Sequence, residues 1–111
     1  MNRFHLDSFQ VIADPSRREI LMLLSKENLS INEIAKNFEI SRPAISKHIK
    51  VLETTGFISI ENKGRERSCI LNSEGFEEIQ QWISFFDNYW KTRLHKLENY
   101  LDKKHTNLKT P

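Results

Sequence analysis

The segment 41–54 carries the side chains whose chemistry is most specific. Wound as a helix at about 100° per residue, it separates into an apolar face and a face of cations, one hydroxyl and one acid. Arginine and lysine can bind guanine edges, and serine can bind a base or a phosphate. The polar face consists of Arg42, Pro43, Ser46, Lys47, Lys50 and Glu53. A helix of this kind is suited to the major groove of double-stranded DNA.

A second group of cations follows in the segment 57–71. Residues 57–61 and 67–71 are short β-prone runs, and residues 62–66 between them are typical of the turn of a hairpin. The cations of this segment are Lys63, Arg65 and Arg67. A basic helix alone could be an ordinary solvated surface. A basic helix followed by a basic hairpin favours DNA, with the hairpin 61–67 on the flanking phosphate backbone.

The residue types do not support catalysis. The chain has one cysteine, Cys69, and three glycines, which excludes an internal disulfide, a multi-cysteine zinc site within one chain and a glycine-rich phosphate loop. Ser46 and His48 lie two positions apart in the predicted helix, so they do not face each other as a nucleophile and base would. We therefore expect no enzyme activity, no catalytic residue and no cofactor.

Capping signals define the elements that position these cations. N-cap residues are predicted at the starts of three helices: Asp14 (followed by Pro15), Ser30 (with Glu33 as its capping-box partner) and Ser41. The last of these helices should stop at Gly56, and one more helix is expected over Phe4–Ile12. The sequence predicts a mainly α fold with a small β-hairpin, a winged helix-turn-helix that ends in a long helix.

The segment 74–101 is typical of one long amphipathic helix, because apolar residues recur three and four positions apart. At about 1.5 Å per residue it would span roughly 42 Å, more than a globule of this size covers. We therefore expect a homodimer built from this helix with the first helix beside it. The alternative is a helix broken in two and folded on its own domain. The predicted interface residues are Phe9, Phe86, Trp90, Leu94, Leu97 and Leu101.

Length and hydropathy limit the organisation of the chain. Its 111 residues suit one domain, which we place at 1–104, with a flexible tail at 105–111. No apolar run is long enough for a membrane span, and the first ten residues lack the apolar core of a signal peptide. The sequence thus predicts a cytoplasmic protein without a membrane partner.

Three blocks carry a family resemblance: Asp14 to Leu21, Ser46 to Leu52, and Gly56 to Ile58. With them the chain, over about residues 4–101, resembles the ArsR (ArsR/SmtB) family of bacterial winged-helix repressors. The resemblance implies a dimeric, sequence-specific repressor that binds a palindromic operator, with helix 41–54 as the DNA-reading helix and the hairpin as the wing. The base-reading positions that it implies are Arg42, Pro43, Ser46 and Lys47. Glu39 stands in a turn where the family often has glycine.

The family's metal sites are poorly matched. The helix before the DNA-reading helix has no cysteine or histidine, and of the pattern on the last helix only His95 and Glu98 match. Two ligands per chain make a poor site, so we expect no metal. The aromatic last helix resembles the metal-independent, SdpR-like subset of the family, which implies autoregulation. The sequence does not identify an inducing signal. The alternatives are a metal-responsive ArsR-type repressor and a winged-helix module that binds protein.

Four other residues that could do chemistry are given structural roles. Arg17 and Arg18 follow a helix start and are expected to be ion-pair partners. His48 falls in the apolar arc of its helix and is expected to bond the backbone at the edge of the core, with a contact to a DNA phosphate as the alternative. Cys69 is expected to be a small buried apolar group.

Overall fold

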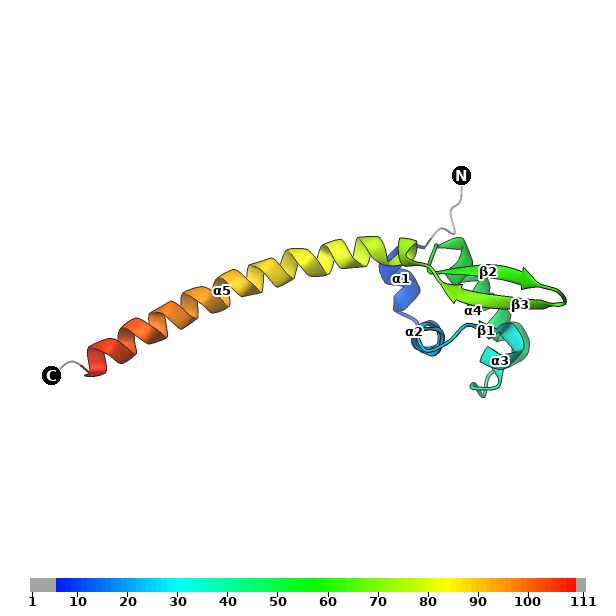
Figure 1. Cartoon of the computed structure of the whole chain (residues 1–111), viewed down its shortest axis with the longest axis horizontal. Coiled ribbons are helices and arrows are strands. Elements are labelled where there is room, and N and C mark those ends of the chain that lie inside the picture. The colour runs from blue at the N-terminus through cyan, green and yellow to red at the C-terminus, as the bar shows by residue number, and fades with distance from the viewer. Residues whose placement is uncertain (1–5, 110–111) are drawn as a thin grey trace. The chain divides into compact units, whose positions relative to one another are not determined.

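Figure 1 shows a computed structural model of the chain, which describes the backbone of residues 6–109 and the side chains of residues 6–104. The chain divides into two units, residues 1–79 and residues 80–111, and each is described by itself. Within its described residues, the first unit contains all of the strands and short helices. The second unit is helical from residue 80 to residue 109.

The helices of the first unit are α1 (Ser8–Ile12), α2 (Pro15–Leu24), α3 (Ile31–Ala35) and α4 (Arg42–Thr54). Three begin at the predicted caps: the side chains of Asp14, Ser30 and Ser41 accept hydrogen bonds from backbone N–H groups of the following turn. The predicted capping box is also present, because the Ser30 N–H donates to Glu33 Oε1 at 2.9 Å. Helix α4 ends as predicted before Gly56, whose φ of 84° lies in the left-handed region.

Helix α1 is shorter than the predicted helix Phe4–Ile12. It begins at Ser8 because Asp7 forms a second capping box. Asp7 Oδ1 accepts from the Gln10 N–H at 2.8 Å, and the Asp7 N–H donates to Gln10 Oε1 at 2.9 Å. An aspartate with extended backbone at this position stops the helix from starting earlier. Residues 4 and 5 lie outside the described residues.

The predicted hairpin is present with longer strands and a shorter turn. Strands β2 (Ile58–Lys63) and β3 (Glu66–Leu71) pair antiparallel, with Lys63 opposite Glu66, so only Gly64 and Arg65 form the turn. The φ of 62° at Gly64 suits the first position of a two-residue hairpin turn. The sequence prediction missed β1 (Leu29–Ser30), which pairs with the other edge of β3 and gives the order β1-β3-β2.

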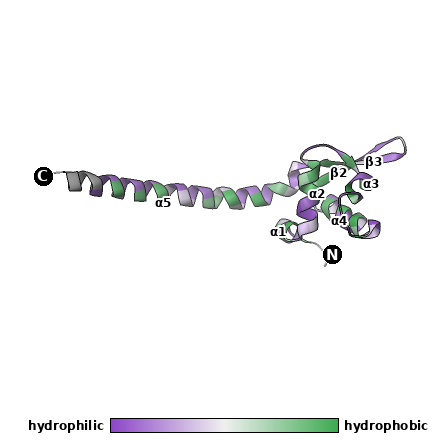
Figure 2. Ribbon diagram, turned by 90° about the horizontal axis from the view of Figure 1, so that it is seen from below, coloured by the Kyte–Doolittle hydropathy of each residue, from purple (hydrophilic) through white to green (hydrophobic). Residues whose placement is uncertain are grey.

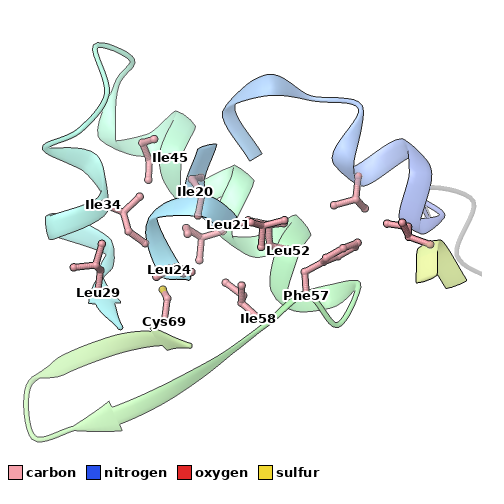
Figure 3. Close-up of a cluster of buried hydrophobic side chains, with 13 residues drawn as sticks. Ile20, Leu21, Leu24, Leu29, Ile34, Ile45, Leu52, Phe57, Ile58 and Cys69 are labelled. Atoms are coloured by element: carbon pink, nitrogen blue, oxygen red, sulfur yellow. The ribbon is translucent and has the colours of Figure 1, made fainter. Parts of the chain in front are cut away.

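The core of the first unit lies where the helices meet the sheet (Figure 3). In that view side chains from α2, α3, α4 and the hairpin point into one cluster, with the Cys69 sulfur between helix and strand. The apolar face of α4 therefore sits in the same core as the sheet that carries the wing. The buried hydrophobic residues are Val11, Ile20, Leu21, Leu24, Leu29, Ile34, Ile45, Ile49, Leu52, Phe57, Ile58, Cys69 and Ile79.

The long helix begins later than predicted. Asn72 first caps a 3-10 helix, η1 (Ser73–Phe76), by accepting from the Glu74 N–H at 3.0 Å, and α5 (Glu77–Lys109) follows. Phe76 packs edge-on against Phe57, with ring centroids 4.8 Å apart, and Ile79 is buried. These two apolar positions therefore belong to the core of the first unit, not to an exposed stripe.

In the second unit, α5 runs past the predicted end at residue 101 and covers the first residues of the expected tail. Figure 2 shows hydrophobic and hydrophilic residues alternating along it, as an amphipathic helix requires. No helix among the described residues is long and apolar enough to cross a bilayer. The division into a domain at 1–104 and a tail at 105–111 stays a prediction, and residues 110 and 111 lie outside the described residues.

Gly75 provides a test of the packing between η1 and the core. A Cβ on Gly75 would lie 2.7 Å from the Phe57 ring and from its backbone nitrogen. We expect Gly75→Ala to lower the free energy of unfolding by about 1–3 kcal/mol, as overpacking does. Gly64→Ala is the control, because no atom lies within 4 Å of its Cβ and only its positive φ adds a cost, about 1 kcal/mol. Equal denaturation midpoints for Gly75→Ala and the parent protein would show that this packing is wrong.

Candidate nucleic-acid interface

Helix α4 exposes the predicted polar face and buries the opposite one. The buried side chains, at most 2% exposed, are those of Ile45, Ile49 and Leu52. The exposed residues are Arg42, Pro43, Lys47 and Lys50, and Ser46 is half-buried. This pattern confirms the two faces expected from helical periodicity. The three cations therefore project from a helix whose rotation is fixed by the core.

Arg42, the first residue of α4, is held by two neighbouring side chains. Its Nε donates to Asn32 Oδ1 of α3 at 2.8 Å, and its Nη1 donates to Ser46 Oγ at 2.5 Å. Asn32 is a residue that the sequence prediction missed. It stands ten positions before Arg42 across a turn, so no local pattern signals the pair.

A groove lies between α3, α4 and the hairpin. It is lined by five of the predicted DNA-binding residues: Arg42, Ser46, Lys50, Arg65 and Arg67. The groove thus unites helix and wing cations that are separated in the sequence. Pro43, Lys47 and Lys63 are exposed but do not line it. A further cation that the sequence prediction missed, Lys36, also lines it.

Acidic side chains make the groove charge-mixed. The acids that line it are Glu33, Glu53 and Glu66. Hydrogen bonds from the Ser30 backbone N–H and hydroxyl lower the pKa of Glu33, so this carboxylate stays ionised. The groove therefore carries both signs of charge, whereas the exposed cations Lys47 and Lys63 do not line it.

Arg17 ties α4 to the preceding helices. Its Nε donates to the Val11 carbonyl at 2.7 Å and its Nη2 to the Gln10 carbonyl at 3.2 Å, both in α1. Its Nη1 lies 3.8 Å from Asp14 Oδ2, which confirms the expected ion pair. The same Nη1 lies 3.4 Å from His48 Nδ1 on α4. The expectation that His48 bonds the backbone is therefore wrong, because its partner is an arginine side chain.

Arg18 differs from its expected role, and the turn at Glu39 has no left-handed residue. Arg18 donates to the Ile12 and Ala13 carbonyls at 2.7 and 3.1 Å and makes no ion pair within the described residues. It satisfies the free carbonyls at the end of α1, which is why it needs no acid. No described residue other than glycine has a positive φ, so the turn at Glu39 avoids the left-handed conformation.

Three residues bear on thiol and metal chemistry: Cys69, His95 and Glu98. Cys69 is fully buried, as predicted, and burial raises the pKa of its thiol. Among the residues that the structure describes, no three His, Cys, Asp or Glu side chains are grouped to hold a metal ion. His95 and Glu98 are both exposed on α5.

The predicted dimer residues lie in both units. Phe9 is half-buried and packs against the core of the first unit. The other predicted interface residues lie in the second unit, and the exposed fractions of their side chains run from 38% at Phe86 to 60% at Leu94. Further aromatic rings widen this apolar face, and Trp82, Phe85 and Tyr89 each pack edge-on against Phe86. An isolated helix does not bury such a face by itself.

Comparison with known proteins bears on both fold and function. Residues 14–59 match the family described as "Bacterial regulatory protein, arsR family". The chain is 36% identical over 80 residues to the transcriptional repressor SdpR of Bacillus subtilis, covering 72% of this chain and 89% of that protein. The resemblance predicted from the sequence is confirmed.

Solved structures agree with the fold. An ArsR family transcriptional regulator superposes with a TM-score of 0.68 at 36% identity, covering 76% of this chain and 92% of that one. A second structure is a homodimeric winged helix-turn-helix DNA-binding domain from Mycobacterium bovis, a possible ArsR-family regulator. It superposes with a TM-score of 0.58 at 16% identity, covering 73% of this chain and 75% of that one. At this identity the likeness supports the fold alone. The winged helix-turn-helix fold is confirmed, and the chain belongs to the ArsR family of regulatory proteins.

Proposed function

We propose that this protein is a sequence-specific, DNA-binding transcriptional repressor. The observation that carries the proposal is the groove in which cations of α4 and of the wing lie together. In this arrangement Arg42, Pro43, Ser46 and Lys47 enter the major groove, while Lys50 and the wing contact phosphates. Repression, rather than activation, of transcription is supported by the similarity to SdpR, which is named a transcriptional repressor. A DNA-binding role also supports a cytoplasmic location.

The functional unit of the proposal is a homodimer on a palindromic operator. Two copies related by a two-fold axis present two α4 helices about 34 Å apart, one turn of B-DNA. The wide apolar face of α5 supports this assembly, since a second copy would remove it from water. The Mycobacterium bovis domain, which has the same fold, is itself homodimeric. Autoregulation is tested by identifying the DNA fragments that the purified protein retains. If it represses its own operon, the region upstream of its own gene should be among them.

DNA contact by α4 and the wing is tested by three substitutions. Arg42→Ala and Lys47→Ala should each weaken binding to the preferred duplex by about 1–3 kcal/mol if they bind bases. Arg65→Ala should weaken all duplexes alike and flatten the salt dependence of the binding constant, as loss of a phosphate contact does. Lys26→Ala, an exposed cation outside the groove, is the control. Unchanged affinity for Arg42→Ala and Lys47→Ala would exclude this face of α4 as the reading surface.

Dimerisation through α5 is tested by placing charge on its apolar face. Trp90→Glu and Leu94→Glu should give monomers in sedimentation velocity, because an unpaired carboxylate in an apolar interface is costly. Both side chains are exposed within the single chain, so the first unit should keep its fold by circular dichroism. Asn99→Glu is the control, because Asn99 is exposed and lies about 180° around the helix from Trp90 at 100° per residue. Two fully dimeric variants would contradict this interface.

Metal independence is tested by measuring DNA affinity with added ions. Micromolar zinc, cadmium, copper or arsenite should leave the affinity unchanged, because His95 and Glu98 give each chain too few donors for a regulatory site. A loss of about tenfold with zinc, abolished in His95→Ala, would instead favour a metal-responsive repressor.

A further inference from the structure

We propose that Asn32 is a positioning residue that sets the DNA sequence specificity of Arg42. The inference rests on the proposed function of Arg42 as a base-reading residue. Asn32 lies on α3, outside the DNA-reading helix, and its Oδ1 accepts from Arg42 Nε at 2.8 Å. Ser46 holds the same guanidinium from α4 at 2.5 Å. The two acceptors belong to different helices, so together they define the direction of an otherwise exposed side chain.

The hydrogen bonds leave the useful edge of the guanidinium available. The Nε–H and one N–H of Nη1 are used within the protein. The other N–H of Nη1 and both of Nη2 remain, and the outer edge of the planar group is formed by one N–H from each of these two nitrogens. Two parallel donors on that edge match the O6 and N7 acceptors of guanine. The internal contacts therefore aim the arginine without consuming the donors that read a base.

The core fixes the distance between Asn32 and Arg42. Ile34, two residues after Asn32, and Ile45, three residues after Arg42, are both fully buried in the same cluster. The capping box of Ser30 and Glu33 also fixes the first turn of α3, where Asn32 lies. The backbone that carries Asn32 is thus held in place relative to α4. A long side chain held in advance loses less rotamer freedom when DNA binds.

This role differs from a direct DNA contact by Asn32. A direct contact to a phosphate would strengthen binding to every duplex and would not need Arg42. A positioning role acts only through Arg42 and only on the preferred sequence. The two roles therefore differ in the ratio of affinities for specific and nonspecific DNA, and in what happens when Arg42 is absent.

The experiment is a double-mutant cycle on two probes. The probes are the duplex that the purified protein enriches from a random-sequence library and the same duplex with its base order shuffled. We expect Asn32→Ala to reduce the ratio of the two affinities by about threefold to tenfold, the range of one hydrogen bond. In the Arg42→Ala background the same change should have no further effect. Asn32→Asp keeps the acceptor, so the ratio should persist although the added charge weakens both affinities.

Asn37→Ala is the matched control, because Asn37 is an exposed asparagine just after α3 whose amide donates to the Glu33 carbonyl and does not contact Arg42. It should leave the ratio unchanged. Equal losses on both duplexes for Asn32→Ala, or an undiminished effect in the Arg42→Ala background, would overturn the positioning role while leaving the proposed function intact. An unchanged ratio for Arg42→Ala alone would overturn the base-reading role of Arg42, and this inference with it.

Discussion

The burial of one face of α4 is the constraint on which the rest of the molecule depends. Ile45, Ile49 and Leu52 are anchored in the core, and a helix held along about two turns cannot rotate. The direction of every cation on the opposite face follows from that anchoring. The strand residues Ile58 and Cys69 pack in the same core, so the position of the wing relative to α4 is fixed as well. Helix and hairpin can then act as one surface.

Polar contacts refine what the core fixes. Arg17 connects two carbonyls of α1 to His48 of α4, and Asn32 connects α3 to Arg42. Arg17 joins elements distant in the sequence and Asn32 joins two consecutive helices, so α4 has side-chain contacts with both α2 and α3. In the hairpin, the pairing of Lys63 with Glu66 places Arg65 at the turn itself. A surface that recognises DNA requires this kind of rigidity, since precise hydrogen bonds to bases tolerate little displacement.

The sequence predicts the features that local chemistry determines. The caps at Asp14, Ser30 and Ser41, the stop at Gly56 and the two faces of α4 all depend on neighbouring residues, and the structure confirms them. Features that depend on tertiary packing were missed or misplaced.

The strand Leu29–Ser30 is too short to have a periodicity, and it exists only because β3 offers it an edge. The partners of His48 and Arg42 likewise come from elements brought together by the core. The long helix was predicted to begin early, because its first apolar residues follow helical spacing although they pack in the core. The grouping of Arg42 with Arg65 could be expected from the family resemblance, and Glu53 from its place on the polar face of the helix. Glu33, Lys36 and Glu66 beside them could not be expected.

Backbone amide chemical shifts, recorded on the intact protein while the enriched duplex is added, test the central claim most directly. If α4 and the wing form one reading surface, the largest changes will fall in residues 42–50 and 63–67, with smaller changes along α3. Changes confined to α1, α2 and the far side of the sheet would contradict the claim. DNA would then bind a surface that contains neither the polar face of α4 nor the wing.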